Sequence, residues 1–266
     1  MNIVTLKGGL GNQLFEYGRY RRLQQKEHST YLYYYRKQLK QHGNILLSDC
    51  FDVTLSPQNP FIVAIVYVFK LFRALHLFKH LYDDEQEDCT FIDDYCQHKP
   101  YAEAARDSLN FKKLELSDYH KKIVEKITAD DYPVAIHVRR GDYLHPANIQ
   151  DFGICPIDYY TKGIEYIKSH HPEATFFLFS DDIAWTKEHL KDEKAVYVEP
   201  QEGCPDYIDL FLMTLCKGHI IANSTFSFWG AYLSRQQPYC NVYPRQWFKN
   251  ETWNKPDFIP ADWQPV

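Results

Sequence analysis

Residues 132–143 read Tyr-Pro-Val-Ala-Ile-His-Val-Arg-Arg-Gly-Asp-Tyr, a mostly apolar run that ends abruptly in charged residues and a glycine. Such a run is typical of a strand buried on both faces of a parallel sheet. The same reasoning predicts strands at 175–180, 195–198, 219–222 and 241–243, with helices between them at 157–169, 183–190, 205–216 and 227–234. This alternation predicts an α/β fold with a parallel sheet covered by helices on both faces.

The N-terminal half is predicted to begin with another strand–turn–helix unit. A strand at 1–6 runs into Lys-Gly-Gly-Leu-Gly-Asn-Gln at 7–13, and apolar residues at helical spacing follow. This glycine turn has neither the spacing of a dinucleotide fingerprint nor the Lys-Ser/Thr of a P-loop. A second strand is predicted at 29–35. The charged stretch near residue 128 is the expected boundary between domains 1–128 and 129–266.

Composition excludes several classes of protein. The chain has 266 residues, a formal net charge of −5 and 45% hydrophobic residues, so it can bury a sizeable core and has no basic excess for holding nucleic acid. Its seven cysteines include no Cys-x-x-Cys pair, and residues 1–6 do not resemble a signal peptide. Free thiols in the cytoplasm are therefore expected.

Residues 61–82 form the most apolar stretch and are predicted to be helical. The uninterrupted apolar run covers only 61–69, too short to span a bilayer. Lys70, Arg73, His76 and Lys79 follow at three-residue spacing. Two interpretations are open: an ordinary amphipathic helix whose apolar side packs in the first domain, which is the commoner case, and a helix that lies on an anionic membrane. His76 and His80 have the spacing of metal ligands, but no carboxylate lies between them, and no metal site is expected.

Polar residues follow three of the predicted strands, at the edge where parallel sheets bind ligands. Arg139 and Arg140 present planar forks suited to phosphate, although a solvated turn that caps the strand has the same pattern. Asp181 and Asp182 follow the strand at 175–180, where Ser180 or Asp181 is also a plausible helix cap. Small hydroxyl residues follow the strand at 219–222, at a helix start that favours phosphate or simply needs a cap.

These motifs, in this order, resemble the bacterial α-1,2-fucosyltransferases of glycosyltransferase family eleven. The resemblance is carried by residues 8–15, 91–97, 137–143, 154–160, 179–182 and 223–230. Departures are small: Leu14, Glu16 and Gly18 stand where the family often has Met, Gln and Ala, and Cys96 where it often has Trp. The resemblance implies two Rossmann-like domains of the GT-B type, and inverting transfer of L-fucose from GDP-β-L-fucose to the 2-hydroxyl of a terminal galactoside. It also implies that no metal or other cofactor is needed.

The resemblance further implies roles for individual residues. Arg139 would contact the β-phosphate, Asp181 or Asp182 the guanine, and Asn12 the sugar phosphate from the first domain. Asp142 is the first choice for the base that deprotonates the acceptor, with His145 and Asp151 as alternatives. The residues implied in GDP-fucose binding are Asn12, His137, Arg139, Asp181, Asp182, Ser224, Thr225 and Phe226.

Two competing functions share these motifs: fucosyl transfer to another hydroxyl, and binding of a nucleotide sugar or glycan without turnover. The expected partners are GDP-fucose and a galactose-terminated or lipid-linked glycan, with no nucleic acid. The expected location is the cytoplasm, with peripheral contact at the inner membrane face through 61–82 as the further hypothesis.

Overall fold

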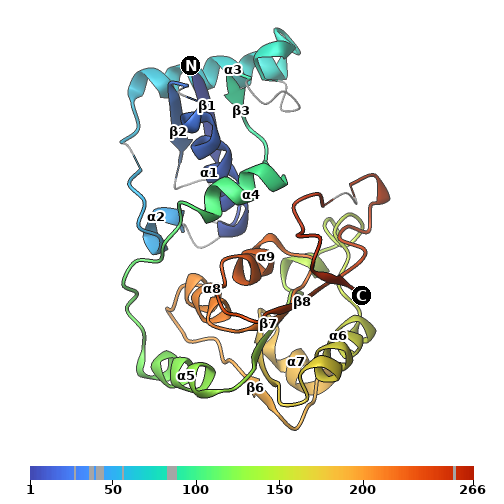
Figure 1. Ribbon diagram of the computed structural model, residues 1–266. Helices are drawn as coiled ribbons and strands as arrows, with labels where there is room; N and C mark the ends of the chain where they lie inside the picture. Colours follow the sequence, from blue (N-terminus) through green and yellow to red (C-terminus); the bar gives the residue numbers. More distant parts are fainter. Residues whose placement is uncertain (27, 36–38, 40–44, 56, 83–88, 254–255) are drawn as a thin grey trace. The chain divides into compact units, whose positions relative to one another are not determined.

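The computed structural model describes residues 1–266 except 27, 36–38, 40–44, 56, 83–88 and 254–255. The chain forms two compact units, Met1–Lys113 and Leu114–Val266. The division lies earlier in the chain than the boundary expected near residue 128, because helix α5 (Asp118–Ala129) belongs to the second unit. Each unit has its own sheet (Figure 1).

The second unit contains a six-stranded parallel sheet in the order β6-β5-β4-β7-β8-β9. Its strands are β4 (Pro133–Val138), β5 (Thr175–Ser180), β6 (Ala195–Tyr197), β7 (Gly218–Ile220), β8 (Cys240–Tyr243) and β9 (Gln264–Pro265). The connecting helices are α6 (Ile157–His170), α7 (Ile183–His189), α8 (Tyr207–Thr214) and α9 (Thr225–Tyr232). The predicted alternation is confirmed, with ends shifted by one or two residues.

The strand order reverses direction beside β4. The chain moves outward from β4 to β5 and β6, and then returns to place β7 on the other side of β4. Figure 1 shows α6 and α7 on one side of this sheet and α8 and α9 on the other. Because the loops after β4 and β7 therefore turn toward opposite faces, a crevice for a ligand is expected at their carboxyl ends.

The first unit contains a three-stranded parallel sheet in the order β2-β1-β3. Its strands are β1 (Asn2–Leu6), β2 (Thr30–Tyr34) and β3 (Phe91–Ile92), and its helices are α1 (Leu10–Gln25), α2 (Leu47–Cys50), α3 (Pro60–Ala74) and α4 (Lys99–Arg106). One face of the sheet packs on α3 through a buried cluster that includes Ile3, Val66 and Phe91. The strand at 29–35 is confirmed, whereas α2, β3 and α4 were not predicted.

The helix predicted over 61–82 is shorter than expected. Asn59 caps α3 by accepting a hydrogen bond from the backbone of Phe61 at 2.9 Å, and the helix ends at Ala74. His76 and Phe78 then take the left-handed backbone conformation, and a single 3-10 turn covers Lys79–Leu81. The expected single stripe of cations is therefore wrong. Among the residues that the structure describes, no helix is long and apolar enough to cross a membrane.

Helices α1 and α4 pack with their backbones unusually close together. A Cβ atom added to Gly18 of α1 would lie 1.9 Å from the backbone oxygen of Tyr101 in α4. Only glycine fits at this position without moving one helix, because the obstructing atom belongs to the backbone rather than to a flexible side chain.

We therefore expect Gly18→Ala to destabilise the first unit by about 1–3 kcal/mol, despite the higher helix propensity of alanine. Thermal and urea melting would measure the loss. Gln25→Ala, an exposed change in the same helix, is the matched control and should change stability by less than about 0.5 kcal/mol. Equal stability of Gly18→Ala and wild type would contradict the close packing of α1 on α4.

Candidate functional site

The register of β4 and β5 brings the first two motifs together. Val138 lies beside Ser180 in the parallel ladder, so the residues that follow each strand leave the sheet side by side. Arg139 is consequently a neighbour of Asp181, and Arg140 a neighbour of Asp182. In the chain, 42 positions separate Arg140 from Asp182. The expected meeting of motifs at the carboxyl edge of the sheet is thus observed for these two strands.

Arg139 is held by two carboxylates. Its Nη2 lies 2.6 Å from Oδ1 of Asp142, and its Nη1 lies 3.0 Å from Oδ2 of Asp181. Its Cζ lies 5.6 Å from the centre of the Tyr143 ring. The side chain keeps 29% of its accessible surface, so the guanidinium is fixed in position and still reachable from solvent. A fixed, accessible guanidinium is suited to a bound anion.

Arg140 has a structural role. Its backbone N–H donates to Oδ1 of Asp181 at 2.9 Å, and its Nε donates to Oδ2 of Asp182 at 3.1 Å. Its guanidinium also stacks over the ring of Trp185, with Cζ 3.8 Å from the ring centre. Because both of these donors are directed at α7 or the turn before it, Arg140 fastens the end of β4 to the start of that helix.

Asp182 is the N-cap of α7. Its Oδ1 accepts from the backbone N–H of Trp185 at 3.2 Å, and its own N–H donates to the hydroxyl of Ser180 at 2.9 Å. The expectation that Ser180 or Asp181 caps the helix is therefore wrong by one or two positions. Each oxygen of the two carboxylates has a partner within the protein, but both side chains stay partly exposed, and a guanine contact by Asp181 or Asp182 stays a prediction.

Gly141 leaves room for the close approach of Asp181. A Cβ atom at this position would lie 2.7 Å from Oδ2 of Asp181, the same oxygen that holds Arg139. The glycine thus allows the carboxylate to reach the guanidinium, in addition to letting the chain turn.

His137 is buried at the end of β4 and is neutral. Burial, followed by the charge of Arg139, lowers its pKa from 6.5 to about 3. Its ring lies 5.7 Å from the ring of Phe226 at the start of α9, so the predicted residues of β4 and α9 are brought together. Its Nδ1 has no hydrogen-bond partner among the described residues.

The segment after β7 is fastened to the loop after β4. The hydroxyl of Tyr143 donates to the backbone oxygen of Asn223 at 3.1 Å. The Asn223 side chain in turn donates to the backbone oxygens of Phe152 and Trp247 at 3.0 and 3.1 Å. Ser224 is the N-cap of α9 and Thr225 its first residue, while Ser224 makes no side-chain cap bond. Their contact with a nucleotide stays a prediction.

Sequence reasoning missed the roles of Tyr143 and Asn223. Both lie inside the quoted motifs, but neither was assigned a function. Burial raises the pKa of Tyr143, so this phenol stays protonated and can donate to Asn223. One signal in the sequence could have indicated the role of Tyr143. An aromatic residue is unusual directly after four charged or small residues, and Tyr143 ends the motif 137–143 in this way.

The three candidate bases lie in one exposed loop. Asp142 pairs with Arg139, as described above. His145 accepts the backbone N–H of Ala147 on Nδ1 at 3.3 Å, and Asp151 accepts from the side chain of Asn250 at 3.2 Å. All three lie between residues 142 and 151, and the choice among them stays a prediction.

The first unit holds the remaining predicted residue, Asn12, in the first turn of α1. Its Oδ1 accepts from the side-chain amide of Gln97 at 3.1 Å, which joins the motifs 8–15 and 91–97. Each of these motifs is thus connected within the first unit. A sugar-phosphate contact by Asn12 stays a prediction.

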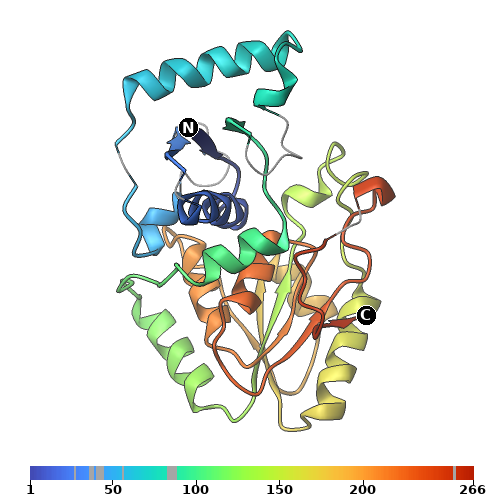
Figure 2. The same ribbon diagram turned by 45° about the horizontal axis from the view of Figure 1, so that its top comes forward.

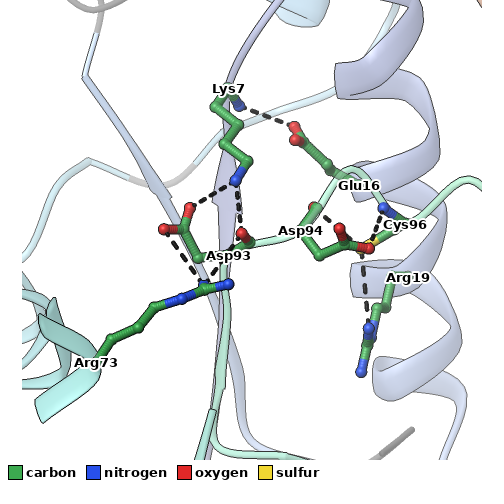
Figure 3. A network of polar contacts seen from close by, with 7 residues as sticks. All are labelled: Lys7, Glu16, Arg19, Arg73, Asp93, Asp94 and Cys96. Atoms are coloured by element: carbon green, nitrogen blue, oxygen red, sulfur yellow. Dashed lines mark hydrogen bonds and ion pairs between the residues drawn. The ribbon is translucent and has the colours of Figure 1, made fainter. Parts of the chain in front are cut away.

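A polar network lies beneath these two motifs (Figure 3). Asp93 accepts the ion pairs of Lys7, at 3.1 Å, and of Arg73, at 3.7 Å. Glu16 accepts the backbone N–H of Lys7 at 2.8 Å, and burial raises its pKa well above the ordinary value. The network ties β1, α1 and α3 to the segment after β3.

Among the described residues, no three His, Cys, Asp or Glu side chains gather into a possible metal site. His76 and His80 do not share a helix face, because α3 ends at Ala74. Metal independence stays a prediction.

The neutral state of His137 predicts a pH dependence of stability. Below pH 6.5 the unfolded chain binds a proton at His137 that the folded chain does not bind, so stability falls as the pH falls from about 6.5 toward 3. This one group contributes a slope of up to about 1.4 kcal/mol per pH unit.

We expect His137→Asn to remove that slope. Urea melting of both proteins at several pH values would show it, and parallel curves would contradict it. Other buried histidines such as His219 are present in both proteins and cancel.

The sequence was compared with those of known proteins, and several glycosyltransferases are similar to it. Among Escherichia coli relatives, the O-antigen biosynthesis glycosyltransferase WbnK is 36% identical over 172 residues, which cover 64% of this chain and 55% of WbnK. An alpha-1,2-colitosyltransferase is 29% identical over an alignment of 288 positions that covers 98% of this chain and 97% of that protein. The Bos taurus galactoside alpha-(1,2)-fucosyltransferase 1 is 30% identical over 105 residues, 38% of this chain and 29% of that protein.

The solved structure of NodZ alpha-1,6-fucosyltransferase, soaked with GDP-fucose, has a similar fold. Its TM-score is 0.53 at 14% identity, with 87% of this chain and 91% of NodZ covered. The expected fold class, α/β with two Rossmann-like domains of the GT-B type, is confirmed. The family model described as Glycosyl transferase family 11 matches residues 86–264, about two thirds of the sequence. The chain therefore belongs to glycosyltransferase family 11.

Proposed function

We propose that this protein transfers L-fucose from GDP-β-L-fucose to the 2-hydroxyl of a terminal galactoside, with inversion and without a metal. Family membership and the names of the relatives support fucosyl transfer in general. The observation that supports transfer from a nucleoside diphosphate without a metal is the guanidinium of Arg139, fixed by two carboxylates and accessible at the carboxyl edge of the sheet.

Arg139 is proposed to stabilise the departing diphosphate. As the bond between fucose and GDP breaks, negative charge grows on the β-phosphate while the sugar becomes positively charged. A guanidinium already held in place by Asp142 and Asp181 needs no reorganisation at that moment, and such preorganised charges lower a barrier most. His137 beside it stays neutral and adds no competing charge.

Binding of the donor is proposed to release Asp142. Of the two carboxylates on Arg139, Asp142 is the more exposed, at 48% against 26% for Asp181, and only Asp181 also holds the Arg140 backbone. A phosphate that binds Arg139 therefore displaces Asp142 more readily than Asp181. The freed Asp142 carboxylate can then accept the proton of the acceptor hydroxyl. His145 and Asp151 are the alternative bases.

The other predicted residues complete the donor site in this proposal. Ser224, Thr225 and Phe226 line the nucleotide, because they lie at the N-terminus of α9, where the helix dipole favours phosphate. Asp181 or Asp182 accepts from the guanine edge. Asn12 acts on the sugar phosphate from the first unit.

A second donor is favoured by one comparison. The relative that matches along 98% of this chain is named for the transfer of colitose. The same Arg139 chemistry would serve nucleotide-activated colitose. Supplying each activated sugar in turn with lactose or N-acetyllactosamine, and measuring nucleotide release and the glycan product, distinguishes the two. Absence of product with either donor would leave a binding protein and contradict the proposal.

We expect Arg139→Lys to lower kcat by about 10²–10³-fold, because lysine keeps the charge and loses the fork that reaches two partners. Initial rates of GDP release and thermal melting would be measured on the same preparations. Arg245→Lys, the same change at a site whose guanidinium donates to the backbone oxygen of Pro265 at 3.5 Å, is the matched control. Undiminished activity of Arg139→Lys would refute the role of Arg139.

We also expect the transfer rate to be unchanged in EDTA. In the proposal the positive partner of the diphosphate is Arg139, and the sequence contains no Asp-x-Asp pair of the kind that holds a cation on a diphosphate. Rates would be compared after chelation and after addition of Mn²⁺ or Mg²⁺. A collapse in EDTA that Mn²⁺ restores would show that Arg139 is not sufficient.

A further inference from the structure

The carboxyl edge of the sheet in the first unit carries two motifs, of which the proposed function uses only Asn12. In the parallel ladder Val4 lies beside Ile92, so the chain leaves β1 and β3 side by side. In Figure 2 the segment after β3, coloured green, runs from the sheet to α4. Parallel sheets bind ligands at the carboxyl ends of their strands. We therefore expect a ligand at this edge of the first unit as well.

Two side chains approach the turn after β1 from different directions. Gly8 has a φ of 67°, and a Cβ atom added to it would lie 3.1 Å from Cε1 of Tyr95 and 3.1 Å from Nδ2 of Asn12. The glycine thus lets an aromatic ring and an amide come close to the same turn. Gln97 joins this group, because its Nε2 donates to Oδ1 of Asn12 at 3.1 Å.

Tyr95 is held with much of its ring open to solvent. The residue after it, Cys96, adopts a φ of 53° without being a glycine, a costly conformation that proteins keep mainly at functional sites. Cys96 is buried, whereas Tyr95 is 44% exposed although Nζ of Lys7 lies 5.1 Å from the centre of its ring. The left-handed residue therefore sends one side chain into the core and leaves the aromatic ring beside it accessible.

The charged network beneath these residues fixes their position (Figure 3). Asp93 pairs with Lys7 and Arg73. Asp94 accepts the backbone N–H of Cys96 on Oδ2 at 2.9 Å. A segment that is already ordered loses little entropy when a ligand binds. The two carboxylates also make this edge unsuited to a second anion, so an uncharged ligand fits it best.

Two polar atoms at this edge are available to such a ligand. Among the residues that the structure describes, the hydroxyl of Tyr95 and Oε1 of Gln97 have no hydrogen-bond partner. Sugar hydroxyls both donate and accept, so they can bond to either atom. In a β-galactoside the hydrogens on carbons 3, 4 and 5 form one apolar face, which can pack on an aromatic ring. An exposed ring bordered by hydrogen-bonding groups is therefore suited to this sugar.

We propose that Tyr95 and Gln97 form the subsite for the galactose of the acceptor, with the apolar face of the sugar on the Tyr95 ring and a sugar hydroxyl donating to Oε1 of Gln97. This inference rests on the proposed function, in which Asn12 contacts the sugar phosphate of the donor. The acceptor hydroxyl must come within about 3–3.5 Å of the anomeric carbon that carries this phosphate. The groups that hold the acceptor therefore lie next to Asn12, and Gln97 is bonded to it.

The experiment is a titration of the full chain with lactose in the absence of any donor, followed by saturation-transfer NMR, with maltose as the disaccharide that lacks galactose. Wild type should bind lactose in preference to maltose. Tyr95→Ala should weaken lactose binding by about tenfold or more, because the stacking surface is lost. Tyr95→Phe, which loses only the hydroxyl, and Gln97→Met should each weaken it by about threefold.

Transfer kinetics distinguish this role from a structural one. Tyr95→Ala should raise KM for lactose by about tenfold and leave kcat and KM for the donor within about twofold of wild type. The matched control is Tyr31→Ala, which removes a tyrosine of similar exposure, 41%, from β2 in the same unit. This variant should behave like wild type in both assays, and thermal melting would show that each variant is folded.

Three results would overturn the subsite: lactose binding that is unchanged in Tyr95→Ala, wild type that binds lactose no better than maltose, and a rise of KM for the donor in place of KM for lactose, which would assign Tyr95 to the donor sugar. A different result would contradict the proposed function alone. In that case wild type transfers no sugar, yet it binds lactose and Tyr95→Ala weakens this binding, which supports the subsite.

Discussion

The ion pair between Arg139 and Asp181 is the contact on which the candidate site depends. It joins the carboxyl ends of two neighbouring strands, and it is possible only because the register places Val138 beside Ser180. The same carboxylate accepts the backbone of Arg140 with its other oxygen. One aspartate therefore fixes both the direction of a side chain and the path of the chain that carries it, and Gly141 is the residue that leaves room for it.

Charge balance explains why so many carboxylates surround two arginines. Three aspartates, at 142, 181 and 182, face Arg139 and Arg140. In the absence of an anion these carboxylates keep the guanidinium groups in one arrangement, at the cost of competing with any phosphate that binds. The competition is unequal, because Asp181 and Asp182 also bond to backbone N–H groups whereas Asp142 contributes one exposed oxygen. Asp181 thus holds Arg139 in place, whereas Asp142 is the partner that a bound phosphate can replace.

Most strands and helices of the second unit were predictable because three of the strands are apolar runs that end in a polar motif, whereas β9 and α5 were not predicted. An apolar run such as 133–138, buried at every position, is typical of a strand in a parallel sheet that helices cover on both faces. The first unit was less predictable. Strand β3 has only two residues, and α4 is amphipathic over just two turns, so neither gives a pattern that stands out from a loop. Helix α3 ends without proline or glycine, at residues that adopt positive φ, and no local signal in the sequence marks that end.

The residues of the candidate site were easier to predict than the contacts between them. The motifs indicated Arg139, Asp181 and His137, but not which aspartate caps α7, because Asp181 and Asp182 are chemically identical and only the turn decides between them. The hydrogen bond from Tyr143 to Asn223 was equally hidden, because it joins side chain to backbone across 80 positions.

The order of strands has a consequence for how the protein is made. Strands β4, β5 and β6 are consecutive both in the chain and in the sheet, so this half, with the Arg139–Asp181 pair, can assemble on the ribosome once residue 197 has emerged. The contacts of Tyr143 with Asn223 and of His137 with Phe226 must wait for the segment after β7, on the far side of β4. A nascent chain therefore carries an exposed edge on its central strand until that segment arrives, and a truncated product would present that edge to other chains.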